Sequence, residues 1–399
     1  MPARHRTALA AAFVAVLVLG PAAPALAAPG AGTRDAGAAS IRAYQAPDAA
    51  ALRAAIAGLP DEEGKEATAA LVRVGGAGGG WRGSSGVAAF GSPRPALEHG
   101  RFRAGSTTKV FTAAVVLQLA AERRIDLDRP VQTYLPDLLP RTFDPVTVRQ
   151  LLNHTSGIQP ADGPGDTFED AYAHRFDTVT PEETVASAVA KGPEFAPGAE
   201  QHYLNINYTV LGLLIEERTG HTYADEVARR VLRPLGLRHT SVPGTDPRIH
   251  GPHNRGYQSV ANGDGGTELR DVTEWNSSSS WAAGDIISTT ADLERFLTAL
   301  FRGRVVPEPQ LREMFTVPEG VRTHGSGEPA AYSAGLTRLE LSDGTVVWGK
   351  SGGRYGYNTL IAATRDLSRT LVASVNGTDA KGQDMNRVIG DLTFAAFGR

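Results

Sequence analysis

The chain has 399 residues, of which 41% are hydrophobic and 21% are charged, and this balance excludes a disordered chain, a coiled coil and a collagen-like repeat. Its length suits two domains or one large composite domain. The formal net charge of -3 lacks the basic excess that nucleic-acid binding needs, so we expect no nucleic-acid partner, and the absence of cysteine excludes disulfides, thiolate metal sites and a cysteine nucleophile.

The first 27 residues have the pattern of a secretory signal peptide. Residues 4–6 are basic, residues 8–20 are almost continuously apolar, and residues 25–27 supply a small-x-small cleavage site. The apolar run is shorter than the roughly 20 residues that a membrane-spanning helix requires, although a retained anchor is the alternative. We therefore expect a secreted protein without a stable membrane anchor, a mature start near Ala28, and a flexible leader rich in Ala, Gly and Ser over residues 28–42.

Strands are expected near both ends of the remaining chain, with helices between them. β-Forming runs bounded by glycine and proline predict strands at residues 67–74, 81–89, 335–341, 345–350, 358–363 and 370–375. Helical spacing of apolar residues and helix-boundary signals predict helices at residues 106–124, 147–153, 181–190, 207–219, 223–231 and 383–397. This order predicts an α/β fold in which both ends of the chain form one sheet and the middle contributes a helical insertion.

Residues 344–353 match two known motifs that their context does not support. The letters GTVVWGKS fit a phosphate-binding loop, but Thr345 to Trp348 favour a strand, and the glycines after Ser351 cannot begin the helix that such a loop needs. Gly349 to Gly353 fit the nucleophile elbow of α/β-hydrolases, but no histidine follows Ser351 to complete that triad. We therefore expect neither a nucleotide site nor an α/β-hydrolase triad.

Ser106 and Lys109 form a better candidate site, at the start of the helix predicted over residues 106–124. Side chains at positions i and i+3 of a helix point to the same side, so the lysine amine can reach the serine hydroxyl. A lysine buried beside a nucleophile can lose its proton and act as a base, and the helix N-terminus stabilises negative charge there. A serine N-cap followed by an exposed lysine is the structural alternative.

Three triplets, in chain order, resemble the motifs of the penicillin-recognising serine enzymes. Ser106 to Lys109 fit S-x-x-K, Tyr203 to Asn205 fit Y-x-N, and Lys350 to Gly352 fit K-[ST]-G. The tyrosine of the second triplet resembles the class C branch, which includes secreted D-alanyl-D-alanine carboxypeptidases. The resemblance extends through residues 146–158, 203–220 and 282–296 and covers most of the chain from about residue 65 onward.

The resemblance implies a β-lactamase/transpeptidase-like fold, with a five-stranded antiparallel sheet flanked by helices and an all-helical lobe. Residues 43–399 would form the catalytic domain. Its α/β part would span about 43–120 and 285–399 and its helical lobe about 121–284, with the site between the two parts.

Three of the matched residues are implied to carry the chemistry. Ser106 would attack the carbonyl carbon, and the backbone N–H groups of Ser106 and Gly353 would form the oxyanion hole. Lys109 and Tyr203 would share the role of base, without a choice between them from the sequence. A tyrosine with an ordinary pKa is a poor base unless cations favour its phenolate, and we expect Lys109 and Lys350 to supply that field.

The other matched residues are implied to bind substrate. The amide of Asn205 suits either the substrate's carbonyl or the amine of Lys109, and Lys350 with Ser351 would bind a terminal carboxylate. Gly352 would remove a side chain where the substrate backbone approaches the strand. Without the other motifs, Asn205 would be interpreted as the N-cap of the helix predicted from Asn207.

The resemblance implies a secreted serine-type D-alanyl-D-alanine carboxypeptidase that acts on peptidoglycan-type peptides and is acylated by β-lactams. A class C-like β-lactamase and an esterase are alternatives, and a non-catalytic penicillin- or peptidoglycan-binding module is a fourth. Lys350 stands where close carboxypeptidase-like relatives frequently have histidine, which leaves peptidase and lactamase open. We expect a monomer with a D-Ala-D-Ala-type peptide or a β-lactam as its small-molecule partner, and no cofactor.

The remaining chemistry-bearing residues are interpreted as structural. His154 and His202 suggest a Ser–His pair, but a lone histidine is more often structural. The acidic group of residues 162–170 is interpreted as a solvated loop rather than a set of metal ligands, so no metal is expected; its members are Asp162, Asp166, Glu169 and Asp170.

Overall fold

The computed structural model describes residues 46–382 and 385–398. The expected signal peptide and the expected leader over residues 28–42 lie outside the described residues. Within the described ranges, no helix has the length and the apolar character needed to cross a bilayer.

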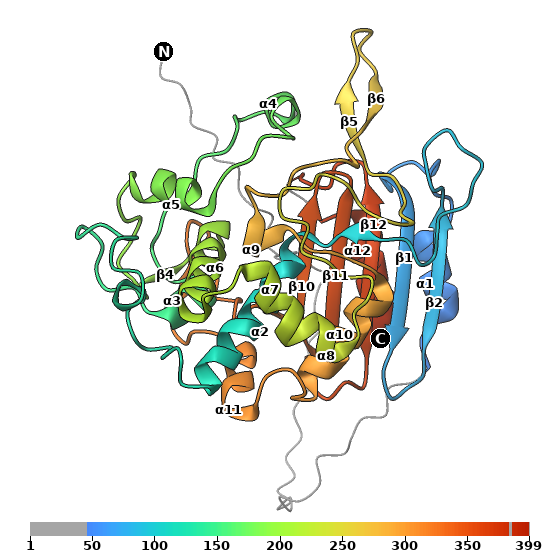
Figure 1. The fold of residues 1–399 in the computed structure, drawn as a ribbon. Helices are drawn as coiled ribbons and strands as arrows, with labels where there is room; N and C mark the ends of the chain where they lie inside the picture. Colours follow the sequence, from blue (N-terminus) through green and yellow to red (C-terminus); the bar gives the residue numbers. More distant parts are fainter. Residues whose placement is uncertain (1–45, 383–384, 399) are drawn as a thin grey trace, which may run out of the picture.

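A six-stranded antiparallel sheet forms the centre of the fold, in the order β2-β1-β12-β11-β10-β9 (Figure 1). Its strands are β1 (Ala67–Gly75), β2 (Trp81–Gly86), β9 (Thr337–Glu340), β10 (Val346–Arg354), β11 (Tyr357–Thr364) and β12 (Thr370–Gly377). Every strand predicted from the sequence is present, and both ends of the chain contribute, as expected. The implied count of five is wrong because β9 pairs with β10 across the turn near Gly344 and adds a short edge strand.

Helices cover both faces of this sheet. On one face, α1 (Ala49–Ile56) and α12 (Arg387–Phe397) pack on apolar side chains of the strands. On the other face, α10 (Thr290–Phe301) contacts β1, β11 and β12 and joins the larger core. With both faces covered, β12 is buried along its whole length. Such a strand appears in the sequence as a short run rich in apolar residues, here with only Thr370 and Ser374 as polar members, which is why residues 370–375 were predictable.

The middle of the chain supplies the helical region at the side of the sheet (Figure 1). Its helices are α2 (Thr108–Ala121), α3 (Val148–Leu152), α4 (Phe168–Ala173), α5 (Pro181–Val189), α6 (Asn205–Thr219), α7 (Tyr223–Val227), a π-helical turn (Ala228–Leu232), α8 (Arg233–Leu235), α9 (Trp281–Gly284) and α11 (Glu308–Leu311). Short 3-10 turns occur at Gly105–Thr107, Val131–Thr133 and Arg312–Phe315.

This helical region is not all-helical, contrary to the expectation. The hairpin of β5 (Tyr257–Ala261) and β6 (Thr267–Asp271) projects from the molecule (Figure 1). The Asn262 side chain accepts backbone N–H bonds from Asp264 and Gly266 and so closes the turn. Two pairs of two-residue strands also occur, β3 (Phe102–Arg103) with β7 (Ile287–Ser288) and β4 (Glu200–Gln201) with β8 (Arg322–Thr323).

Candidate active site

Ser106 lies in a 3-10 turn, Gly105–Thr107, that leads directly into α2. Strand β10 packs closely against this turn: a Cβ on Gly105 would lie 2.7 Å from the Gly353 nitrogen, and one on Gly352 would lie 2.0 Å from the Ala104 oxygen. Glycine is therefore required at both contacts. We expected the substrate backbone to approach Gly352 closely. The structure has a close approach there, but the chain that approaches is the protein's own segment around Ser106.

Lys109, in the first turn of α2, is fully buried beside Ser106. Its Nζ lies 3.1 Å from Ser106 Oγ, 2.7 Å from Asn205 Oδ1 and 2.9 Å from the Ala283 carbonyl oxygen. A neutral amine satisfies this environment: its two N–H groups serve the amide and carbonyl oxygens, and its lone pair faces the serine hydroxyl. The predicted Ser–Lys pair is confirmed, and the exposed-lysine alternative is wrong.

Burial lowers the pKa of Lys109 well below its ordinary value, and the nearby Lys350 and Lys381 lower it further. A buried ammonium loses its hydration, and like charges penalise it again, so the neutral amine is favoured. The described residues give this lysine neutral oxygen partners and place no carboxylate in hydrogen bond or ion pair with it. Lys109 is therefore suited to accept a proton. The sequence did not predict that Lys381 acts on Lys109, because Lys381 lies outside the three motifs and far from Lys109 in the chain.

Asn205 is the first residue of α6, two positions before the predicted start. The N-cap is Leu204, so the interpretation of Asn205 as a cap is wrong. Its side chain instead accepts the hydrogen bond from Lys109. The side chain of Asn205 was expected to bind either the substrate's carbonyl or the amine of Lys109, and in the structure it binds Lys109.

Tyr203 is buried between the two lysines of the site. Lys350 Nζ lies 4.5 Å and Lys109 Nζ 4.9 Å from the centroid of its ring. Burial raises the pKa of Tyr203 well above its ordinary value, and the Ser106 hydroxyl only partly opposes this. The lysines were expected to favour the phenolate, but burial of the phenol has the larger effect, and burial also lowers the pKa values of both lysines and so weakens their field.

The Tyr203 hydroxyl is fully buried and, among the described residues, makes no hydrogen bond of ordinary geometry. Ser106 is nevertheless close enough to the phenol to affect its pKa. A buried hydroxyl without a partner is costly, so this one is available to a group that enters the site or to a serine that turns toward it. In this environment Tyr203 is a neutral phenol that is available as a hydrogen-bond donor.

Lys350 and Ser351 lie within β10, which runs without interruption through both residues, as the strand interpretation predicted. Lys350 is only 5% exposed, and burial lowers its pKa to about 7. Its Nζ donates to the Ser351 carbonyl oxygen at 3.0 Å. Near neutral pH this lysine is therefore poised between its charged and neutral forms, and an incoming carboxylate would favour the charged form.

His154 packs against Tyr203 instead of contacting Ser106. Their ring centroids are 4.6 Å apart, and Tyr332 contacts both rings, stacking on Tyr203 at 4.7 Å and meeting His154 edge-on at 5.6 Å. His154 Nδ1 lies 3.2 Å from the Asn207 amide nitrogen, and burial lowers the pKa of His154 well below its ordinary value. The structural interpretation of His154 is confirmed: it is a neutral ring that holds the tyrosine in place.

The acidic residues 162–170 do not form one loop. Asp162 forms an ion pair with Lys191 at 2.6 Å, and Glu169 forms one with Arg270 at 2.6 Å. Asp170 and Thr167 make a reciprocal capping box at the start of α4. Capping and exposed ion pairs, which are typical of surface helices, explain this acidic group.

Residues 52–394 match the family model described as beta-lactamase. The chain is 26% identical to penicillin-binding protein 4* of Bacillus subtilis over 297 residues, which are 72% of this chain and 63% of that protein. It is 33% identical to esterase EstB of Burkholderia gladioli over 189 residues, 44% of this chain and 47% of the esterase. The chain thus spans about half the length of the curated relatives it matches.

Two solved structures are similar over nearly the whole chain. The D-stereospecific amidohydrolase from Streptomyces sp. superposes with a TM-score of 0.74 and 36% identity, covering 88% of this chain and 99% of that one. The D-amino acid amidase from Ochrobactrum anthropi SV3, complexed with L-phenylalanine, superposes with a TM-score of 0.70 and 26% identity, covering 86% and 96%. Both likenesses include the sheet and the helical region together.

Proposed function

The chain belongs to the beta-lactamase family, and we propose that it hydrolyses amide bonds of D-amino acid substrates through an acyl-enzyme on Ser106. It is a serine hydrolase of the superfamily that contains β-lactamases and penicillin-binding proteins. The named activities of the Streptomyces and Ochrobactrum proteins support the D-configured substrate. The contact of Lys109 Nζ with Ser106 Oγ, at 3.1 Å, carries the proposal.

The reaction follows from that contact. The Ser106 oxygen bonds to the carbonyl carbon while its proton passes to the neutral amine of Lys109. The tetrahedral adduct then expels the amine of the leaving group, which takes a proton from the site, and the ester on Ser106 remains. Water attacks that ester, loses a proton to the same base, and releases the acid and the free serine. We assign the base role to Lys109 and a donor role to Tyr203, because burial favours the neutral form of both.

The substrate's end group separates two forms of this proposal. A D-alanyl-D-alanine carboxypeptidase needs a free carboxylate, which Lys350 and Ser351 would bind. A D-stereospecific amidohydrolase accepts an amide without one, and the 36% identity to the Streptomyces amidohydrolase favours this second form. A lysine whose pKa is about 7 also provides only part of a positive charge before the substrate enters.

A matched pair of substrates tests the two forms. We would compare kcat/KM for an acyl-D-alanyl-D-alanine peptide and for its C-terminal amide, with L-configured peptides as controls. A charge-assisted hydrogen bond is worth about 1.5–3 kcal/mol, so a carboxypeptidase should lose roughly 10- to 100-fold on amidation. An amidohydrolase should show no such loss. Hydrolysis of L-peptides as fast as D-peptides would contradict both forms.

Mass spectrometry after incubation with a β-lactam tests the remaining alternatives. A persistent adduct on Ser106 supports a peptidase, whereas rapid turnover of the β-lactam supports a β-lactamase. Hydrolysis of simple esters without amide hydrolysis would support an esterase. No adduct and no hydrolysis would indicate a binding module. The Ser106→Ala variant is the control in each case, because only the nucleophile is removed.

We further propose that the protein is exported and cleaved near Ala28. The support is the basic, apolar and small-residue pattern of residues 4–27. N-terminal sequencing of protein from the culture medium tests this. Protein found only inside the cell with Met1 retained would contradict it.

A further inference from the structure

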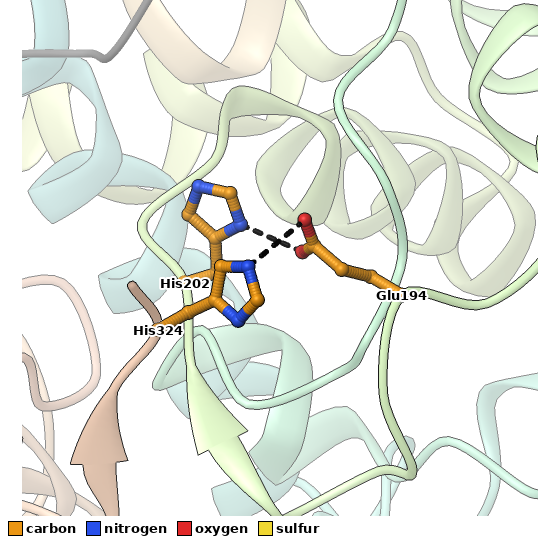
Figure 2. A group of neighbouring side chains, drawn as sticks. All are labelled: Glu194, His202 and His324. Carbon is orange, nitrogen blue, oxygen red and sulfur yellow. Dashed lines mark hydrogen bonds and ion pairs between the residues drawn. The ribbon is translucent and has the colours of Figure 1, made fainter. Parts of the chain in front are cut away.

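A second cluster of titratable side chains is formed by Glu194, His202 and His324 (Figure 2), and His202 directly precedes Tyr203 in the chain. Glu194 lies between two histidines: its Oε2 is 2.6 Å from His202 Nδ1, and its Oε1 is 3.5 Å from His324 Nε2. One ligand atom from each residue fits within 4.8 Å of the others. Among the described residues this is the one such group of three, and the catalytic chemistry above does not use it.

Backbone hydrogen bonds hold all three residues in place. The Glu194 N–H donates to the Gly157 carbonyl at 2.7 Å, and the His202 N–H donates to the His154 carbonyl at 2.9 Å. The His324 N–H donates to the Gln201 carbonyl at 2.9 Å, at the end of the β4–β8 pair. The cluster is therefore organised by the fold and does not depend on flexible surface side chains meeting by chance.

A fourth residue orients one of the histidines. His324 Nδ1 lies 2.7 Å from Glu200 Oε2, which leaves Nε2 directed at Glu194. A metal-bound histidine characteristically gives its other ring N–H to a carboxylate, which fixes its tautomer and raises its basicity. The rings of His202 and His324 stack with centroids 5.0 Å apart. Both rings thus present a nitrogen to the same carboxylate.

We propose that Glu194, His202 and His324 bind one Zn²⁺ ion. Two imidazole nitrogens and one carboxylate form a common zinc donor set, and tetrahedral zinc with bonds of about 2.0–2.1 Å holds its ligands roughly 3.3 Å apart. Glu194 Oε1 and His324 Nε2, which are 3.5 Å apart, are close to this value. His202 Nδ1 contacts the other carboxylate oxygen, Oε2, at 2.6 Å, so small side-chain rotations must bring one Glu194 oxygen and the two nitrogens, now within 4.8 Å of one another, to this spacing. Water would complete the fourth position.

The surroundings of the cluster suit a metal that is taken up from solution. The side chains of Glu194, His202 and His324 are 18%, 23% and 36% exposed, so they are partly shielded and still reachable. The ion would join the segment before Tyr203 to the residue after β8. We therefore assign it a stabilising role next to the active site and no step in the hydrolysis.

Two other histidine–carboxylate pairs in the described residues provide a matched control. In the pairs His174–Asp177 and His250–Asp246, a histidine nitrogen lies 2.7 Å from a carboxylate oxygen, but no second histidine faces that carboxylate among the described residues. They are also more exposed. A single histidine with one carboxylate binds zinc weakly, so changing His250 should leave metal binding as it is.

Cobalt titration of the full-length, tag-free protein tests the site. After dialysis against a chelator, Co²⁺ is added and its visible absorption, which reports tetrahedral coordination, is followed; Zn²⁺ is then added in competition. We expect one ion per chain and displacement of Co²⁺ by Zn²⁺. His202→Ala and His324→Ala should each weaken binding about 100-fold, Glu200→Gln about 10-fold, and His250→Ala not at all. Zinc at 100 times the wild-type Kd should raise Tm by about 2–5 °C in the wild type and in His250→Ala, and by much less in His202→Ala and His324→Ala.

Circular dichroism of every variant shows whether it is folded. Should the alanine variants fail to fold, Glu194→Gln keeps the geometry and removes the charged ligand, and it should weaken binding by a similar factor. Fewer than one ion per chain, no tetrahedral cobalt spectrum, or equal affinity in His324→Ala and His250→Ala would overturn the proposal.

Discussion

The catalytic cluster contains Tyr203, the histidine cluster contains its neighbour in the chain, His202, and the two clusters treat charge in opposite ways. Lys109 is fully buried among neutral oxygens, with further lysines near it. Glu194, His202 and His324 are half-exposed, and each imidazole has a carboxylate partner. The first arrangement removes a charge, whereas the second pairs charges and leaves ligand atoms accessible.

The contrast shows that burial and partner type, more than residue type, decide what a titratable group does. Lys65 forms an ion pair with Glu62 at 3.1 Å, whereas the partners of Lys109 among the described residues are neutral oxygens, which suits Lys109 to the base role proposed for it. The following changes test that distinction, in decreasing order of expected effect.

Replacing the nucleophile should have the largest effect. In Ser106→Ala we expect no covalent adduct with a β-lactam and a fall in kcat of at least about 10³-fold, because the hydroxyl proposed to attack the carbonyl carbon is removed. Intact-protein mass spectrometry and initial rates measure these. The Tm should change little, since one hydroxyl contributes little to packing. Labelling at the wild-type level would show that another residue is the nucleophile.

Removing the buried base should slow acylation by roughly 10²- to 10⁴-fold in Lys109→Met. The matched control is Lys65→Met: Lys65 is also buried and donates to two carbonyl oxygens, those of Ala54 and Ala57, but lies outside the site. We expect Lys65→Met to lower Tm while acylation continues. Stopped-flow acylation and thermal melts separate the two. Equal acylation rates in both variants would contradict the base role.

The donor role of Tyr203 predicts a smaller loss. Tyr203→Phe should slow acylation about 10²-fold, the lower end for a positioned proton donor. Tyr208→Phe is the control, because the Tyr208 hydroxyl is also buried but donates to the Leu152 carbonyl at 2.9 Å. That variant should lose stability and keep its acylation rate. The reverse pattern would place Tyr203 among structural residues.

The depressed pKa of Lys350 predicts a pH-dependent contribution to stability. Between pH of about 7 and the ordinary lysine value of 10.5, the unfolded chain binds a proton that the folded one does not. The free energy of unfolding of the wild type should therefore rise with pH relative to Lys350→Met, by up to about 1.4 kcal/mol per pH unit. Urea denaturation of both proteins at pH 7, 8 and 9 measures the difference. A difference that stays constant over this range would show that Lys350 is not discharged by folding.

Much of the fold followed from local patterns. The strand predicted at residues 370–375 is β12, and it was predictable because a strand buried on both faces is rich in apolar residues, here Leu371, Val372, Ala373 and Val375. The hairpin of β5 and β6 was missed because its residues are largely polar and give no alternating pattern. The start of α6 at Asn205 was missed for a different reason: its N-cap, Leu204, has no capping side chain, so the boundary depends on tertiary contacts.

The sequence by itself determined the pairing of the candidate nucleophile Ser106 with Lys109, because the two residues are one helical turn apart and local geometry brings them together. Only the tertiary structure decided their protonation. The buried environment of Lys109 is built by Asn205 and Ala283, which lie far from it in the chain, and the cost of a buried charge depends on that environment. The histidine cluster also depends on the tertiary structure. The pairing of β4 with β8 brings His324 to Glu194, and no local sequence pattern predicts that pairing.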